Sequence, residues 1–299
     1  MTQKHGTCAV FLLVLCWLLF VNGAAHGADL KISCTDCHDS AKFTTGYKTS
    51  VHGNMGCTSC HKSFESLDKH VILKEKPGLN SCGTCHSAIE QQHRSSFHYL
   101  YEDFRCYDCH RDVHSLASHK GNIKIAVIQS CTRCHPNDEY VASGHGAAVL
   151  RGNQDSAACN DCHGLHDTRT YHTSGQEHVL EAREFYNKTC KACHSNAEMM
   201  ERNKINPNAV KQYEETYHGK VFDLGYPASV AGCADCHATH NILPSSNAAS
   251  AVNPTNLTDN CGKCHPRIHP RFAEYKAHPD YRDKKRYPLL FLSFLFMGG

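Results

Sequence analysis

Eighteen of the 20 cysteines in this chain of 299 residues belong to nine copies of the pentapeptide Cys-x-x-Cys-His. Two thiols followed directly by an imidazole form the attachment site for haem c, in which the thiols bind the porphyrin and the histidine ligates the iron. The predicted attachment cysteines are Cys34, Cys37, Cys57, Cys60, Cys82, Cys85, Cys106, Cys109, Cys131, Cys134, Cys159, Cys162, Cys190, Cys193, Cys233, Cys236, Cys261 and Cys264. The predicted proximal ligands are His38, His61, His86, His110, His135, His163, His194, His237 and His265.

Two other uses of paired cysteines explain the pattern less well. Zinc ribbons also contain Cys-x-x-Cys, but they use four ligands per metal and need no histidine after each pair. A disulfide framework has no use for that histidine either. Histidine makes up only 25 of 299 residues, so its presence after all nine pairs is not a chance result. The sequence therefore predicts nine covalently bound haems c, and a protein that moves electrons.

A second set of histidines repeats at twice the period of the motifs. The second, fourth, sixth and eighth motifs each follow a Ser/Thr-x-His segment, which contains His52, His98, His145 or His218. Three of these motifs are followed closely by a further histidine, namely His114, His166 and His240, whereas in the first unit His70 lies nine residues beyond the motif. The pattern indicates four diheme units and a ninth motif, which is trailed by His269 and His278.

These histidines are predicted to be the distal iron ligands. A second histidine closes the iron to small ligands, whereas methionine in that position would raise the reduction potential. Fourteen non-motif histidines follow the predicted leader, against four methionines, Met55, Met199, Met200 and Met297. The predicted distal ligands are His52, His70, His98, His114, His145, His166, His218, His240 and one of His269 or His278, which leaves His93, His119, His172 and His178 spare. The sequence does not indicate which distal histidine serves which haem.

The elements that position these residues are expected to be short. The residues after position 28 provide only about 30 residues per motif, too few for an ordinary apolar core around each one. We therefore expect a mostly irregular chain with short α-helices, cored by haem and arranged as an elongated array of diheme units. The best helical segments are 176–186 and 210–217, and 244–260 is expected to be a loop. The predicted units are 29–81, 82–130, 131–189 and 190–260, followed by a ninth-haem segment at 261–286.

The two ends of the chain carry localisation signals. Residues 1–28 have a basic start, an apolar stretch and small residues at a cleavage site, which is typical of a secretory signal, with a retained anchor helix as the alternative. Residues 288–299 are apolar and would span only about 18 Å as a helix, against a hydrocarbon core of about 30 Å; together with Tyr287 they form the terminal segment 287–299. We interpret them as the start of a truncated transmembrane helix; a tail docked on the haem core or an amphipathic anchor is the alternative. The predicted location is the periplasm, at the inner membrane.

The charge pattern bears on partners. The formal net charge is +2, and the haem propionates would make the loaded protein acidic. No basic stripe suggests nucleic acid. Soluble periplasmic cytochromes that dock through small, transient interfaces are the expected partners.

The alternating Ser-x-His-Gly and Cys-x-Asp-Cys-His segments, as in Cys106-Tyr-Asp-Cys-His and Cys159-Asn-Asp-Cys-His-Gly, resemble the multihaem cytochromes with doubled Cys-x-x-Cys-His motifs. With the leader and the terminal Lys-Lys-Arg-Tyr-Pro-Leu-Leu-Phe run, the chain is similar to the periplasmic nine-haem domain of inner-membrane b/c-type menaquinol oxidoreductases of metal-reducing bacteria. The resemblance implies a partner: a membrane b-type cytochrome domain that oxidises menaquinol and passes electrons to the periplasmic haems.

Three functions remain in competition at this point. The first is electron transfer in anaerobic respiration, with no catalytic residues and no substrate on iron. The second is reduction of a nitrogen or sulfur oxyanion at one open haem, for which the ninth haem is the first candidate. All nine motifs keep their histidine, whereas several such reductases replace it with lysine at the catalytic haem. The third is a conductive filament of stacked chains.

Overall fold

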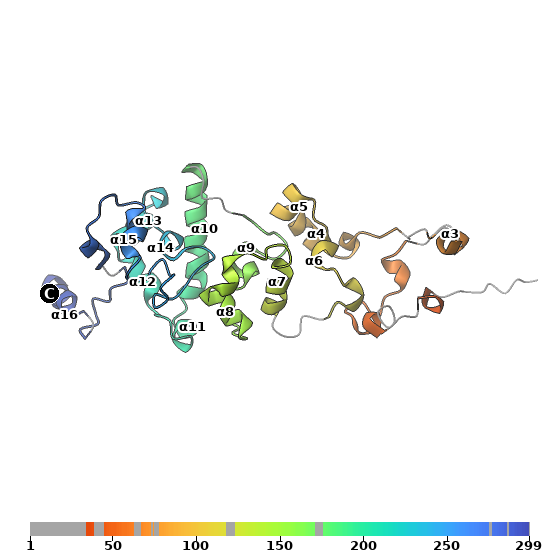
Figure 1. The fold of residues 1–299 in the computed structure, drawn as a ribbon, viewed down its shortest axis with the longest axis horizontal. Helices are drawn as coiled ribbons and strands as arrows, with labels where there is room; N and C mark the ends of the chain where they lie inside the picture. Colours follow the sequence, from red (N-terminus) through yellow and green to blue (C-terminus); the bar gives the residue numbers. More distant parts are fainter. Residues whose placement is uncertain are drawn as a thin grey trace, which may run out of the picture.

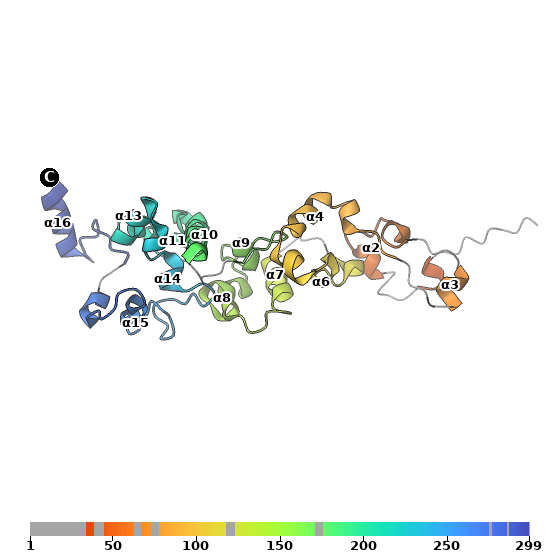
Figure 2. The ribbon, with the colours of Figure 1, turned by 90° about the horizontal axis from the view of Figure 1, so that it is seen from above.

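The computed structural model describes residues 34–38, 45–62, 67–72, 74, 78–117, 123–170, 176–274, 277–285 and 287–298. The predicted leader at 1–28 lies outside the described residues. The described chain contains short α- and 3-10 helices joined by irregular segments, and its one β-pairing is an isolated bridge between His61 and Leu79. The described chain is elongated: its N-terminal part lies at one end of a long axis, its middle part at the centre and its C-terminal part at the other end (Figures 1 and 2). The expectation of an irregular fold with short helices is confirmed.

The first two units contain helices of three to eight residues. They are η1 (Cys34–Asp36), α2 (Tyr47–Thr49), η3 (Cys57–Ser59), α3 (Leu67–Ile72), η4 (Cys82–Thr84), α4 (Ser87–Arg94), α5 (Phe97–Glu102), α6 (Cys106–Cys109) and η5 (Val113–Ser115). Helix α7 (Ile123–Cys131) spans the predicted boundary between the second and third units, and the third unit then contains η6 (Glu139–Ala142), α8 (Gly144–Leu150) and α9 (Cys159–His163). In each of these units the motifs lie on, or at the end of, a short helical turn.

The second half of the chain contains the longest helix. It comprises α10 (Gln176–His194), α11 (Ala197–Arg202), α12 (Ala209–Glu214), α13 (Tyr217–Asp223), η7 (Pro227–Ser229), α14 (Cys233–His237), α15 (Leu257–Gly262), η8 (Pro270–Glu274) and α16 (Pro288–Gly298). Helix α10 stands across the long axis in Figure 1 and carries the whole seventh motif at its C-terminal end.

Two sequence expectations for helices differ from the structure. The helix expected at 176–186 continues to His194, so the predicted boundary between the third and fourth units falls inside α10. The single helix expected at 210–217 is two helices, because Thr216 ends α12 and begins α13: its Oγ1 accepts a hydrogen bond from Gly219 N at 3.1 Å. A side chain that caps a new helix requires non-helical backbone at its own position, and this breaks the segment.

The aliphatic core of the described chain is small. The buried apolar residues are Ile128, Val149, Ala158, Ala182, Met200 and Val230, and the first three form one cluster. None of the 18 motif cysteines forms a disulfide, and ten of them are exposed. Burial of so little aliphatic surface does not offset the entropy of ordering a chain of this length. The described residues therefore have little apolar core of their own beside the motifs.

An acidic residue at the third position of three motifs starts the motif helix. Asp108, Asp161 and Asp235 each accept a hydrogen bond from the backbone N–H three residues earlier, at 2.7, 2.7 and 2.8 Å. This satisfies an N–H group that a helix start otherwise leaves without a partner. Lys124 of α7 lies 3.0 Å from Asp161, and Arg183 of α10 lies 3.1 Å from Asp235. In these two cases the ion pair also ties the second motif of a unit to a helix that carries the first.

The last helix, α16, is apolar on all sides. Leu289, Phe296 and Met297 are among its exposed residues, and Phe294 packs on Tyr281 with ring centroids 4.5 Å apart. Among the helices of the described residues, none is both long enough and apolar enough to cross a membrane.

Candidate functional site: nine pairs of histidines

Every motif histidine lies against a histidine from outside the motifs. The ring centroids of these nine pairs are between 5.7 and 6.3 Å apart. The pairs, motif histidine first, are His38–His70, His61–His114, His86–His52, His110–His166, His135–His98, His163–His240, His194–His145, His237–His278 and His265–His218.

The separation within the pairs suits one metal ion between two imidazoles. Imidazole nitrogens lie about 2 Å from a bound metal, so two that share it from opposite sides are about 4 Å apart and their ring centroids about 6 Å apart. In the pair with the closest centroids, Nε2 of His163 lies 3.4 Å from Nε2 of His240. Both nitrogens therefore face the same point, as ligands on opposite sides of one ion do.

The far side of several rings is held by an oxygen atom. Nδ1 of His163 donates to Arg169 O at 2.9 Å, and Nδ1 of His278 donates to Ala209 O at 2.8 Å. Nδ1 of His240 lies 3.1 Å from a carboxylate oxygen of Asp138. An oxygen acceptor at Nδ1 places the ring proton there, which leaves the lone pair of Nε2 free to bind a metal.

Burial favours the neutral form of these rings. It lowers the pKa of His237 to about 4, and it also lowers the pKa of His145 and His194, in each case as the largest cause. Neutral imidazole is the form that ligates metal ions. The protein environment therefore keeps these rings in the ligating form at neutral pH.

The pairing follows a rule in the forward direction. The Ser/Thr-x-His histidine of each unit lies against the first motif histidine of the next unit. His52, His98, His145 and His218 thus face His86, His135, His194 and His265, at 6.0 to 6.3 Å between ring centroids.

The histidines that follow the second motifs of the later units, and the one that follows the ninth motif, face the preceding unit. His114, His166, His240 and His278 face the second motif histidine of the preceding unit, respectively His61, His110, His163 and His237. The first pair differs, because His70 faces His38 of its own unit. Adjacent units thus exchange two histidines, one in each direction.

The structure brings eight of the distal candidates, and His278, to motif histidines. The sequence left His269 and His278 as candidates for the ninth motif. In the structure His278 faces His237 of the eighth motif, and it is His218 that faces His265 of the ninth. His269 instead accepts a hydrogen bond at Nδ1 from Arg271 N at 3.2 Å. His119, His172 and the side chain of His178 lie outside the described residues.

The methionines take no part in the nine pairs. Met200 is buried at 4 % exposure, and Met55 accepts a hydrogen bond through its backbone carbonyl. Met199 donates its backbone N–H to Oδ1 of Asn196, which caps α11, and Met297 is exposed on α16.

Within each unit, the two motifs meet through their first cysteines. The first cysteine of one motif lies close enough to that of the other to perturb its ionisation, in the pairs Cys34 with Cys57, Cys82 with Cys106, Cys131 with Cys159 and Cys190 with Cys233. Burial, with the neighbouring thiol as the next cause, raises the pKa of Cys34 and of Cys106. Cysteine contacts within units and histidine exchange between units together place the nine pairs in one continuous row.

The Ser/Thr-x-His pattern has a structural cause. Ser143 and Thr216 cap α8 and α13, each accepting from a glycine N–H at 3.1 Å, so the histidine falls in the first helical turn. A Cβ atom on Gly146 would lie 2.2 Å from Tyr140 O, which explains the glycine after the histidine. Ser96 caps α5 in the same way, although Tyr99 takes the place of the glycine.

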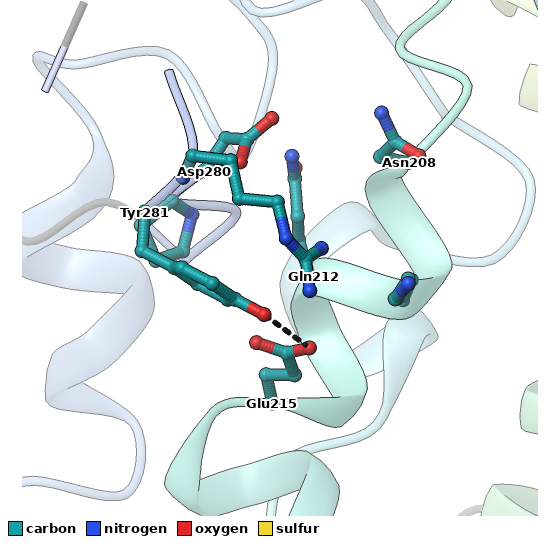
Figure 3. A pocket seen from close by; sticks show the side chains of 8 residues that line it. Asn208, Gln212, Glu215, Asp280 and Tyr281 are labelled. Atoms are coloured by element: carbon teal, nitrogen blue, oxygen red, sulfur yellow. Dashed lines mark hydrogen bonds between the residues drawn. The ribbon is translucent and has the colours of Figure 1, made fainter. Parts of the chain in front are cut away.

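The segment with His278 is docked on α12. A cavity of about 250 Å³ separates residues 279–282 from α12, and Tyr281 OH donates to Glu215 Oε1 at 3.5 Å across it (Figure 3). Together with the bond from His278 to Ala209 O, this contact holds the segment where His278 faces His237.

Comparison with protein families, curated proteins and solved structures found no match. The described residues contain no group of three or more His, Cys, Asp or Glu side chains that could hold a metal ion. Each site that the chain forms is thus a pair of imidazoles beside a pair of thiols. This donor set fits haem c, whose porphyrin nitrogens supply the other iron ligands.

Proposed function

We propose that this protein is a periplasmic nine-haem c-type cytochrome that carries electrons in anaerobic respiration, from a membrane quinol pool toward periplasmic or extracellular acceptors. The observation that carries the proposal is the set of nine histidine pairs, each beside a Cys-x-x-Cys motif. Bound haem c supplies an iron that alternates between the ferric and ferrous states.

The residues of the chain have distinct roles in this proposal. The motif cysteines would hold the haem covalently, and the motif histidine and its distal partner would ligate its iron. Nδ1 contacts, such as that of His278 with Ala209 O, fix the ring orientation so that both oxidation states keep the same ligands. The exchange between units sets the spacing of the row.

The alternative of a reductase with one open site receives less support. It needs an iron with a free distal position, and the ninth site was its first candidate. His265 of that site faces His218 at 6.1 Å between ring centroids. The nine pairs favour electron transfer, because a second histidine excludes substrates from the iron.

A conductive filament also receives less support from the pairing. The first and the last motifs find their partners, His70 and His218, within this chain. The pairs therefore leave no described motif histidine that needs a ligand from another copy.

The proposed membrane partner is a quinol-oxidising b-type cytochrome domain next to α16. The apolar helix follows the basic residues Arg282, Lys284 and Lys285, which suits attachment at a membrane surface. Soluble periplasmic cytochromes are the proposed acceptors. Removal of residues 287–299 is expected to move the protein from the membrane fraction to the soluble periplasmic fraction. An unchanged distribution would argue against the anchor.

The central test is the number and ligation of the haems. The chain is expressed with its leader in a host that matures c-type cytochromes, and haem is counted per chain by the pyridine haemochrome spectrum. We expect nine haems, a low-spin ferric EPR spectrum, and no binding of carbon monoxide by the reduced protein. A high-spin signal that responds to nitrite or hydroxylamine would favour the reductase, and the absence of covalent haem would refute the proposal.

A further inference from the structure

One hydrogen bond recurs in all four diheme units. We call His52, His98, His145 and His218, which face the next unit, the forward histidines. In each unit, the side chain five residues before the forward histidine donates a hydrogen bond to the backbone carbonyl two residues before the second motif. Tyr47 OH donates to Met55 O at 2.9 Å and Tyr140 OH to Ala157 O at 2.6 Å. Tyr213 OH donates to Ala231 O at 2.9 Å.

The second unit makes the same bond with a different side chain. Nε2 of His93 donates to Phe104 O at 2.9 Å, and Phe104 is two residues before Cys106. Ser96 Oγ lies 3.4 Å from Nδ1 of the same ring, which suits an acceptor nitrogen there. His93 is not paired with a motif histidine, and this hydrogen bond gives it a different role.

The recurrence is not a product of local chain geometry. Donor and acceptor are separated by 8, 11, 17 and 18 residues in the four units. A turn of fixed length would make one such bond automatically, but loops of four different lengths would not. The same endpoint is reached each time, which indicates that the endpoint itself matters.

The backbone of the same residue is linked to the forward histidine. In the four units, Ser50, Ser96, Ser143 and Thr216 donate their N–H to its carbonyl, at 3.0, 2.9, 3.0 and 2.9 Å. These Ser and Thr residues directly precede the histidine turn, and three of them cap its helix. The residue is therefore bonded at its side chain to the second motif and at its backbone to the turn.

We propose that Tyr47, His93, Tyr140 and Tyr213 are positioning residues, here termed clamp residues, which hold each forward histidine in ligating position on the next unit. The inference rests on the proposed function, since it concerns the distal ligands of bound haem. The clamp anchors the histidine turn to the second motif of its own unit, and the histidine extends from there to the first motif of the next. Tyr140 and Tyr213 are half-buried, and burial raises the pKa of both hydroxyls, so they remain protonated donors.

The test uses Tyr140→Phe, which keeps the ring and removes the hydroxyl. The forward histidine of this unit is His145, so the site of His194 is expected to open. One neutral hydrogen bond corresponds to a change of roughly three- to tenfold in an equilibrium. We expect the equilibrium between bound and released His145 to shift toward release by that factor, so that the reduced variant binds carbon monoxide under conditions in which wild type binds none. Tyr226→Phe, at a tyrosine that is 63 % exposed, is the matched control and should match wild type.

Two double variants locate the effect. Combined with His145→Gly, which opens the site of His194 completely, Tyr140→Phe is expected to add no further carbon monoxide binding. Combined with His240→Gly, which opens the site of His163, it is expected to add its full increment. Effects that pass through one shared site are non-additive, whereas independent sites add.

The second unit provides a rescue. His93→Phe is expected to raise carbon monoxide binding, and His93→Tyr is expected to restore the wild-type level, because tyrosine makes this bond in the other three units. Haem content per chain is measured for every variant, so that loss of folding is distinguished from an opened site.

Three results would overturn the inference. Tyr140→Phe could bind no more carbon monoxide than wild type, its effect could add to that of His145→Gly, or tyrosine at position 93 could behave like phenylalanine. In each case a wild type with nine closed haems would leave the proposed function intact. A wild type without covalent haem would refute the proposed function and the clamp role together.

Discussion

Replacement of His278 by glycine is expected to open the site of His237 in the eighth motif, and to leave the other eight closed. The two rings lie 6.1 Å apart between centroids. His269 lies closer in sequence to the ninth motif, and in the absence of the structure it is an equal candidate for a ligand. Since it is held instead by Arg271 N, His269→Gly is the matched control and should open nothing.

The size of the effect follows from the one-to-one pairing. Each motif histidine has one partner, so the loss of one partner should expose one iron in nine. The reduced His278→Gly protein should bind one equivalent of carbon monoxide per nine haems, and added imidazole should displace it by filling the vacated position. Carbon monoxide difference spectra, scaled to the pyridine haemochrome count, measure this ratio directly.

The opened site can be located by removing the eighth haem. In a chain that also carries Cys233→Ala and Cys236→Ala, His278→Gly should no longer bind carbon monoxide. Binding that persists in that background would place the opened iron at the ninth motif and would refute the exchange rule at this end of the row. Binding by the His269→Gly control would refute it equally.

Three further predictions concern stability. The hydrogen bond from Arg202, the largest cause, lowers the pKa of Asp155 to about 2, so its stabilising contribution is complete above the ordinary carboxyl pKa. That contribution is lost as the pH falls through about 2, and the difference in thermal midpoint between wild type and Asp155→Asn should shrink over this range. Gly146→Ala should lower the free energy of unfolding by about 1–3 kcal/mol in denaturant titrations, because the added Cβ would lie 2.2 Å from a backbone oxygen. Arg183→Met should cost about 1.5–3 kcal/mol in the same assay, since it leaves Asp235 and two carbonyls without their charged donor.

Each of these three has a control within the chain. Asp259→Asn, which removes a carboxyl group from α15 and leaves Asp155 and Arg202 in place, is the control for the first. Gly56→Ala places its Cβ no closer than 3.9 Å to a neighbour and should be neutral. Arg169→Met removes an arginine whose side chain is 65 % exposed, and should cost less than Arg183→Met. Equal effects in a variant and its control would contradict the corresponding assignment.

The sequence alone predicts much of the candidate site because the motifs are local. Cys-x-x-Cys-His and Ser/Thr-x-His are each shaped by contacts within a few residues, such as the hydrogen bond from Gly146 N to Ser143 Oγ. Residues that are close in these segments of the sequence are therefore also close in the structure. The short helices are predictable for the same reason.

The pairing of the histidines is beyond local spacing. His240 and His163 are 77 residues apart and meet only because two units pack side by side. Sequence distance favours His269 over His218 as the partner of the ninth motif, and the fold brings His218 there. The clamp residues were not recognised in the sequence for a different reason. A tyrosine five residues before the forward histidine occurs in three units, but in the second unit that position is His93.

The exchange of histidines between units gives the ninth motif a structural part in this chain. In a row of four units alone, eight motif histidines and eight distal histidines would balance in number. Two histidines would nevertheless lack a partner in the structure, because His218 pairs with His265 and His237 pairs with His278. A fifth, half-sized unit with one motif and one backward histidine resolves both mismatches at once.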